Sequence, residues 1–405
     1  MAEGARYPKV RPVDVRPIVR NGRPCVLIRD PLRLSDQMLL VPQPLASVLA
    51  LCDGTRDLRA VRAALMVRYG VRVDEEALRA LVAQLDAAYL LDNERFAEAH
   101  ACALEAYRQA PFRPPTLAGE VYPADPEALR RLLRSFQEGL PEEHPVEAGR
   151  GLVSPHIDYA RGGRTYARVW GRAAPFVREA DLVILLGTDH YGEDGALTLT
   201  RQDYATPFGV LPTARSIVEA LAQALGEDRA FAGELRHRGE HSIELAAVWL
   251  HAVREGRPVE LVPILCGPFA SCIAEGRDPA LDPRVGRVVD LLRAAAAGRR
   301  AVVVAAGDLA HVGPAFGGRP LDLRGRARLR AEDEALIERM CAGDAAGFFA
   351  RIHETQDRNN VCGVSPIYLA LCILEPTSGE RVAYALCPAD EAGTSVVSIC
   401  GVLWR

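Results

Sequence analysis

The chain has 405 residues, of which 49% are hydrophobic and 25% are charged, and its formal net charge is -4. This length and composition predict two globular domains with ample core, and the slightly acidic balance argues against nucleic acid as a partner. Ten cysteines without a C-x-x-C pair, an N-terminus without an apolar signal segment and the lack of any apolar run of about 18 residues predict a cytoplasmic protein without a membrane partner.

Residues 1–98 predict a small winged-helix-like α+β domain. Two short alternating stretches, Arg23–Asp30 and Gln37–Gln43, have the pattern of strands, and three helical stretches follow them. Asp57 and Asp74 stand where helix N-caps are expected. Acids and arginines are evenly mixed here, which argues against DNA binding.

Residues 99–115 predict a linker, because a helical stretch gives way to the proline-rich QAPFRPPTL. From residue 116 to residue 405 the pattern alternates between apolar strands and amphipathic helices. This alternation predicts an α/β domain with a largely parallel sheet and some antiparallel strands near the C-terminus.

Three predicted strands of this domain end in histidines and carboxylates. GLVSPH ends in His156, DLVILLGTDH in Asp189 and His190, and AVVVAAGDLAH in Asp308 and His311. Ligands of open α/β sheets bind beyond the carboxyl ends of the strands, so these side chains are expected at one edge. Imidazoles with carboxylates suit a divalent transition metal, whereas the alternative is that each histidine only hydrogen-bonds its own strand end.

Two further stretches carry reactive side chains. Cys362 precedes Gly363 at the start of an apolar helix, where the helix dipole is expected to lower the thiol pKa and favour the thiolate. His241, in GEHSIELAAVWLH, is expected to form an acidic, proton-handling face with Glu240 and Glu244 at a helix start. The H-E-x-x-H pattern of zinc proteases is absent from the sequence.

The segment from about Arg113 to Arg405 resembles the Memo family, which includes the proteins called AmmeMemoRadiSam system protein B. The resemblance rests on short motifs in one order: RPPTLAGEVYPADPEALRRLL, VSPHIDYARGGRTYA, ILLGTDHYG, EHSIE, VPILCG, AAGDLAHVG and NNVCGVSPI. It implies a Memo domain over residues 116–405 with a fold similar to class III extradiol dioxygenases and a metal pocket at the sheet edge.

The resemblance also implies roles for particular residues. By position, His156, His190 and Cys362 would bind iron or copper, with zinc less expected. Asp308 and His311 would be further pocket residues. We predict that these two residues, together with His241, are the catalytic groups that move protons. The family's system name implies a radical SAM protein and a small-domain protein as partners.

Residues 10–96 resemble the small peptide-binding chaperone of pyrroloquinoline quinone biosynthesis, a wing-and-helix fold that grips peptides at a strand edge. The resemblance implies a peptide partner for this module. Three functions therefore remain open: an iron- or copper-dependent redox enzyme of the dioxygenase type, a non-catalytic peptide- or protein-binding adaptor that reuses the pocket, and a zinc hydrolase.

Overall fold

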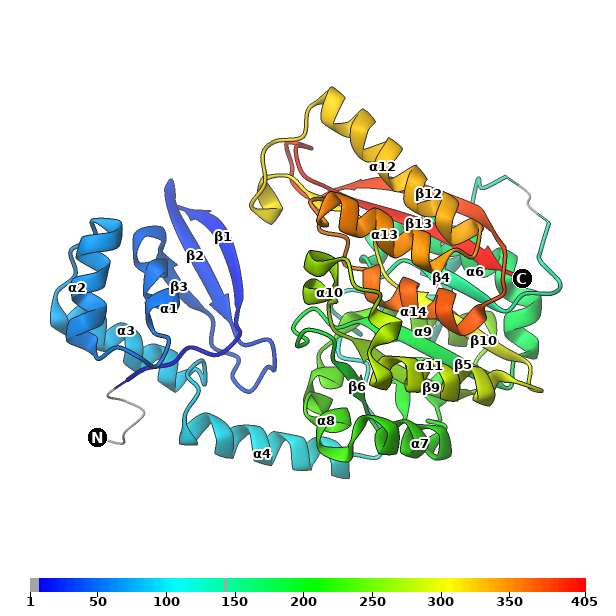
Figure 1. Cartoon of the computed structure of the whole chain (residues 1–405), viewed down its shortest axis with the longest axis horizontal. Helices are drawn as coiled ribbons and strands as arrows, with labels where there is room; N and C mark the ends of the chain where they lie inside the picture. The colour runs from blue at the N-terminus through cyan, green and yellow to red at the C-terminus, as the bar shows by residue number, and fades with distance from the viewer. Residues whose placement is uncertain (1–6, 142–143) are drawn as a thin grey trace. The chain divides into compact units, whose positions relative to one another are not determined.

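The computed structural model describes residues 7–141 and 144–405, which fall into two compact units divided between Gln109 and Ala110 (Figure 1). The first unit combines a three-stranded antiparallel sheet with helices. Its elements are β1 (Asp14–Arg20), β2 (Arg23–Arg29), β3 (Leu39–Pro42), α1 (Ser47–Leu51), α2 (Leu58–Tyr69), α3 (Glu75–Ala87) and α4 (Glu94–Gln109).

The helix signals of the first unit are confirmed. The Asp57 carboxylate accepts a hydrogen bond from the backbone N–H of Ala60 at the start of α2, and Asp74 does the same for Ala77 in α3. These bonds satisfy backbone donors that a helix start otherwise leaves without partners. Gly70 ends α2 in the left-handed conformation, at φ 66°.

The first strand, β1, was not predicted from the sequence. It pairs with β2 through a hairpin at Asn21-Gly22, where both residues have positive φ, 51° and 72°. An Asn-Gly pair between apolar stretches is the turn that matches the twist of two paired strands, so this signal was present. β1 is an edge strand, which accommodates Pro17 because one side of the strand makes no ladder bonds.

The second unit is built on an eight-stranded mixed sheet. Its strand order is β11-β13-β4-β10-β5-β9-β6, and β12 pairs with β13. The four central strands run parallel and the outer ones antiparallel, which confirms the predicted α/β domain. The strands are β4 (Gly151–Ser154), β5 (Leu182–Thr188), β6 (Leu197–Leu199), β9 (Glu260–Cys266), β10 (Ala301–Ala306), β11 (His311–Val312), β12 (Gly379–Pro388) and β13 (Val396–Trp404).

Helices cover both faces of this sheet (Figure 1). Two of them, α6 (Tyr159–Glu179) and α9 (His241–Val253), cover one face. The other face carries α7 (Arg215–Leu225), α11 (Pro283–Ala296), α12 (Leu323–Cys341), α13 (Ala345–Thr355) and α14 (Val364–Leu374). The remaining elements are α5 (Pro126–Ser135), α8 (Glu227–Phe231), α10 (Ala270–Glu275) and the small ribbon of β7 (Tyr204–Thr206) and β8 (Gly209–Leu211). Two covered faces explain why the central strands are continuously apolar.

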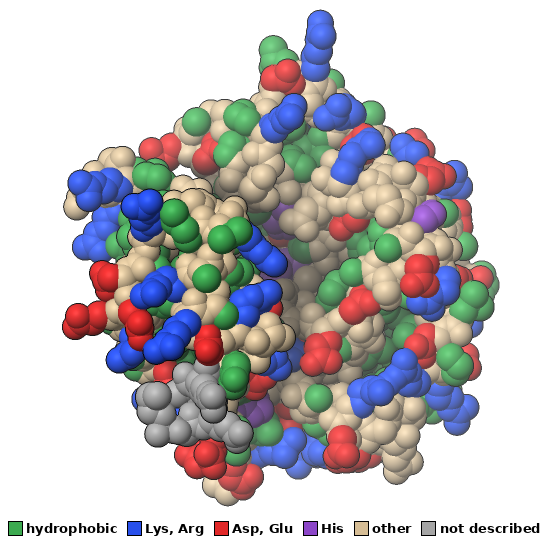
Figure 2. Space-filling model, turned by 60° about the vertical axis from the view of Figure 1, so that its left-hand side comes forward, with side chains coloured by type: hydrophobic (Ala, Val, Ile, Leu, Met, Phe, Trp, Pro, Cys, Tyr) green, Lys and Arg blue, Asp and Glu red, His purple; other side chains and the backbone are tan. Residues whose placement is uncertain are grey.

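The surface of the protein mixes charges of both signs. Acidic and basic side chains are interspersed over the face that Figure 2 shows. Across residues 7–141 and 144–405, none of the helices combines the length and apolar character that crossing a bilayer requires.

Candidate metal centre

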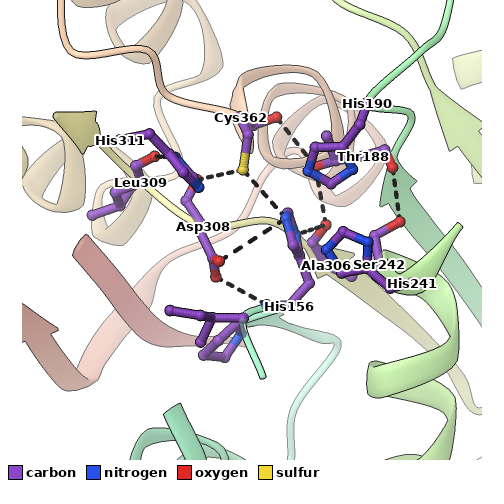
Figure 3. Close-up of polar contacts among 12 residues, drawn as sticks. His156, Thr188, His190, His241, Ser242, Ala306, Asp308, Leu309, His311 and Cys362 are labelled. Carbon is purple, nitrogen blue, oxygen red and sulfur yellow. Dashed lines mark hydrogen bonds and ion pairs between the residues drawn. The ribbon is translucent and has the colours of Figure 1, made fainter. Parts of the chain in front are cut away.

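Five candidate side chains meet at the carboxyl edge of the parallel strands. β4, β10 and β5 are neighbours in the sheet, and His156, Asp308 and His190 each stand two residues beyond the end of one of them. His241 is the first residue of α9, and Cys362 lies two residues before α14. Figure 3 shows these side chains gathered around one space. The structure thus brings together side chains that the sequence separates by up to 206 positions.

Three imidazole rings form the densest part of this group. The ring centroids are 5.0 Å apart for His156 and His190, 5.3 Å for His156 and His241, and 4.7 Å for His190 and His241. One ligand nitrogen of each ring lies within 4.8 Å of the other two. Metal–nitrogen bonds are about 2.0–2.1 Å long, so the three nitrogens would have to move closer together to share one ion.

The outer nitrogen of each ring is already engaged. His156 Nδ1 lies 3.2 Å from the carbonyl oxygen of Ala306, so its N–H donates to that oxygen and Nε2 keeps its lone pair. His190 Nδ1 lies 3.0 Å from one oxygen of the Glu240 carboxylate, and His241 Nδ1 lies 3.0 Å from the other. Such bonds fix the ring orientation and the tautomer that binds a metal.

Glu240 is the functional residue whose role the sequence reasoning missed. Its buried carboxylate also caps α9, accepting hydrogen bonds from the backbone N–H groups of His241 at 2.8 Å and Ser242 at 3.1 Å. Burial alone raises the pKa of Glu240, but His190 and His241 bring it well below the ordinary value. Burial lowers the pKa of His190 in turn, and Glu240 raises it well above the ordinary value. A glutamate directly before a helix that begins with histidine was the available signal.

We expect Glu240→Gln to weaken metal binding by about 10- to 100-fold, the usual cost of losing such an orienting partner. The carboxylate of Glu240 accepts a hydrogen bond from His190 at one oxygen and from His241 at the other. The glutamine amide has a single acceptor oxygen, so one of the two rings loses its fixed orientation. A competition titration with a chelator measures the change. Glu255→Gln, an exposed site just beyond α9, is the matched control and should leave the affinity unchanged.

Cys362 lies beside the three imidazole rings, as expected, but the pKa of its thiol differs from the prediction. Its sulfur is 3.3 Å from His156 Nε2 and 3.6 Å from the carbonyl oxygen of Asp308. The expected lowered pKa is wrong: burial raises the pKa of Cys362, and the interaction with His190 offsets this only partly. Burial is therefore the largest influence on this thiol. Binding of a cation displaces the proton from such a thiol.

Asp308 and His311, the two further candidate residues, lie beside the rings (Figure 3). The Asp308 carboxylate accepts a hydrogen bond of 2.9 Å from the backbone N–H of His156, and burial raises its pKa to about 6. Burial lowers the pKa of His311 to about 4, and its Nδ1 lies 3.2 Å from the carbonyl oxygen of Leu309. Near neutral pH, Asp308 is close to its titration and His311 is a neutral base.

Two acids expected near the site point elsewhere. Asp189 follows β5, but its buried carboxylate binds the guanidinium of Arg236 at 2.8 Å and fixes the following loop. Glu244 does not join an acidic face with His241, because its carboxylate pairs with Arg113. His241 and Glu244 lie about one turn apart on α9 and were therefore expected on one face of the helix. The buried guanidinium of Arg113, near the start of the second unit, instead pairs with the Glu244 carboxylate.

The Arg113–Glu244 pair ties the entry segment of the second unit to α9. Both side chains are almost completely buried, at 0% and 1% exposure. Glu244 also accepts hydrogen bonds from the backbone N–H of Leu117 at 2.9 Å and the hydroxyl of Tyr122 at 2.5 Å. Arg113 donates to the carbonyl oxygen of Glu240 at 3.0 Å. The network thereby holds the end of α9 that carries the metal-site residues.

The site is closed on one side and accessible on the other. The side chain of His156 is 2% exposed, whereas those of His190 and His241 are 27% and 39% exposed. Burial lowers the pKa of His156 well below its ordinary value, and the nearby positive charges of His190 and His241 add to this. His156 is therefore neutral, the form that binds metals.

A family model described as Memo-like protein matches residues 113–402. The chain belongs to the Memo family. Curated relatives include MEMO1 family proteins of Aquifex aeolicus (strain VF5), 27% identical over 76% of this chain and 77% of the relative, and of Methanopyrus kandleri, 30% identical over 72% of this chain and 99% of the relative. A MEMO1 family protein of Archaeoglobus fulgidus is 25% identical over 73% of this chain and its own full length.

The match confirms the Memo resemblance and locates it. It begins at residue 113, so the β1–α4 unit lies outside the matched Memo region. The candidate metal centre lies wholly within that region.

Proposed function

We propose that this Memo protein is a redox enzyme of the dioxygenase type that depends on iron or copper. The observation that carries the proposal is the convergence of His156, His190, His241 and Cys362, with each ring oriented through Nδ1. Three imidazoles and a thiol suit iron or copper rather than magnesium, which prefers oxygen ligands. Bound iron or copper would supply Lewis-acid and redox chemistry beside the accessible side of the site.

The chain's own residues divide the remaining work. Glu240 keeps His190 and His241 oriented, and the Ala306 carbonyl does the same for His156. Asp308, with a pKa of about 6, accepts a proton from a substrate hydroxyl at its carboxylate oxygen. His311 accepts a second proton at Nε2, since its Nδ1 is engaged with a carbonyl.

The proposal extends to the fold class and the partners. Strands whose carboxyl ends deliver the site support the similarity to class III extradiol dioxygenases. Three strands and three short helices before α4 support a winged-helix-like first unit that holds a peptide. A radical SAM protein and a small-domain protein of the same system are the proposed partners, on the family resemblance alone.

Elemental analysis of anaerobically purified protein, combined with oxygen uptake in the presence of catechol, tests the proposal. We expect about one iron or copper per chain and substrate-dependent oxygen consumption. Stoichiometric zinc with ester or peptide hydrolysis would instead favour the hydrolase. Peptide binding without metal and without turnover would favour the adaptor.

Two substitutions, Cys362→Ser and His241→Ala, distinguish the contribution of the Cys362 thiol to metal binding from that of the His241 ring. With Cys362→Ser we expect the metal to remain bound by the three rings, while the charge-transfer absorption of a metal thiolate disappears. With His241→Ala we expect that absorption to persist and the affinity to fall by more than about tenfold, as for loss of a supporting interaction. Retention of full affinity by His241→Ala would assign His241 to proton transfer only.

A further inference from the structure

A cavity of about 700 Å³ lies beside the metal centre. His311 and Asn359 line it, and the backbone N–H of His311 donates to the Asn359 carbonyl at 2.8 Å. These two residues each stand three positions from a residue of the centre, His311 after Asp308 and Asn359 before Cys362. The cavity and the metal centre therefore share the two loops that follow β10 and precede α14.

One wall of this cavity is an aromatic surface. The ring of Phe316 meets the ring of His311 edge-on, with centroids 5.1 Å apart, and Phe316 is 38% exposed. Edge-on contact leaves ring surface for a planar organic group. The wall thus suits the body of an organic molecule rather than an inorganic ion alone.

The cavity lining also contains cationic side chains. Arg319, Arg324 and Arg328 line the cavity, and among residues 7–141 and 144–405 none of the three forms an ion pair or a side-chain hydrogen bond. Arg324 and Arg328 lie one turn apart on α12, where like charges repel each other. Many other arginines of this chain are paired with a carboxylate, as Arg201 is with Glu219. These three guanidinium groups are available to an anion.

Within the described residues, the two acids of the cavity make no ion pair with these three arginines. Asp322 accepts a hydrogen bond of 2.7 Å from the backbone N–H of Gly325 and so caps α12. Glu332 binds the guanidinium of Arg358 and, at 2.7 Å, the side-chain amide of Asn359. Four arginines face two acids in the lining, and both acids are already engaged within the protein.

We propose that this cavity binds the carboxylate or phosphate group of the enzyme's substrate, with Arg324 and Arg328 as the anion-binding residues. Arginine is the side chain best suited to both groups, because its planar donors pair with two oxygens at once. The inference rests on the proposed function for the chemistry at the metal, and it adds the substrate class: a planar organic molecule that carries an oxyanion.

Equilibrium dialysis of the full chain, iron-loaded and metal-free, tests this inference with catechol and 3,4-dihydroxybenzoate as probes. We expect the iron-loaded protein to bind 3,4-dihydroxybenzoate at least about tenfold more tightly than it binds catechol. This is the effect of one good charge-assisted interaction. In Arg324→Gln/Arg328→Gln this preference should vanish while catechol binds as before. The matched control is Arg326→Gln/Arg330→Gln, which removes two charges from α12 at positions outside the cavity lining.

Two outcomes would overturn the inference: equal binding of both probes by the unmodified protein, or a preference that survives in Arg324→Gln/Arg328→Gln. The metal-free arm separates the inference from the proposed function. If the protein takes up no iron, the proposed function fails, and a loss of 3,4-dihydroxybenzoate binding in the metal-free double variant still supports the anion site. Displacement of that probe by inorganic phosphate at lower concentration than by acetate would identify phosphate as the preferred group.

Discussion

His156→Ala is expected to abolish stoichiometric metal binding, with affinity reduced by more than about 100-fold. His156 is the most deeply buried of the three ring donors: its ring lies about 5 Å from both other rings, and its Nε2 lies 3.3 Å from the Cys362 sulfur. Removing it leaves two imidazoles and a thiol whose pKa burial raises. Metal content after anaerobic purification and reloading measures the effect.

The control for this substitution is a histidine away from the centre. His353 lies on α13, where its Nδ1 contacts the carbonyl oxygen of Ile273. His353→Ala should therefore retain the full metal content. Normal metal content in His156→Ala would mean that the ion is held elsewhere, and the centre described here would lose its role.

Glu244→Ala is expected to destabilise the second unit by about 3–5 kcal/mol, the usual cost of leaving a buried charge without its partner. The guanidinium of Arg113 would stay buried at 0% exposure, and the hydroxyl of Tyr122 would lose its acceptor. Urea unfolding followed by tryptophan fluorescence measures the loss in this unit alone. The three tryptophans, Trp170, Trp249 and Trp404, all lie in it.

An exposed ion pair provides the comparison. Glu255 pairs with Arg178 at 3.5 Å and is 70% exposed, so Glu255→Ala should cost less than about 1 kcal/mol. Burial raises the pKa of Glu244, but Arg113 and the hydrogen bonds bring it below the ordinary value. Its contribution is therefore present above the unfolded-state pKa and is lost as pH falls through the folded-state pKa. Equal effects of both substitutions would contradict this account.

Local patterns were enough to predict the α/β class of the second unit. Alternating apolar strands and helices gave the α/β class, and strand polarity placed His156, His190 and Asp308 at one edge, since parallel strands end on the same side. The order β4-β10-β5 was not predictable in this way. It depends on pairing between segments about 120 to 150 residues apart, for which the local sequence carries no signal.

The hydrogen-bond and ion-pair partners of the side chains at the site could not be predicted from the local sequence either, because the partners lie far away in the chain. Asp189 turns to Arg236, which lies 47 positions later, and Glu244 to Arg113, which lies 131 positions earlier. The thiol of Cys362 has the position that the sequence indicated, but its burial depends on the whole fold. Tertiary environment rather than sequence position sets these properties.

The position of β4 in the sheet has a consequence for biosynthesis. β4 is synthesised early, yet both strands that flank it, β10 and β13, belong to the last third of the chain. During translation, more than 140 residues are added after β4 before its first partner strand, β10, is synthesised. Until then both edges of β4 are unpaired, and unpaired strand edges are prone to aggregation. The candidate metal centre is correspondingly completed late, so a nascent chain that stops before Cys362 would present His156 and His190 without the Cys362 thiol.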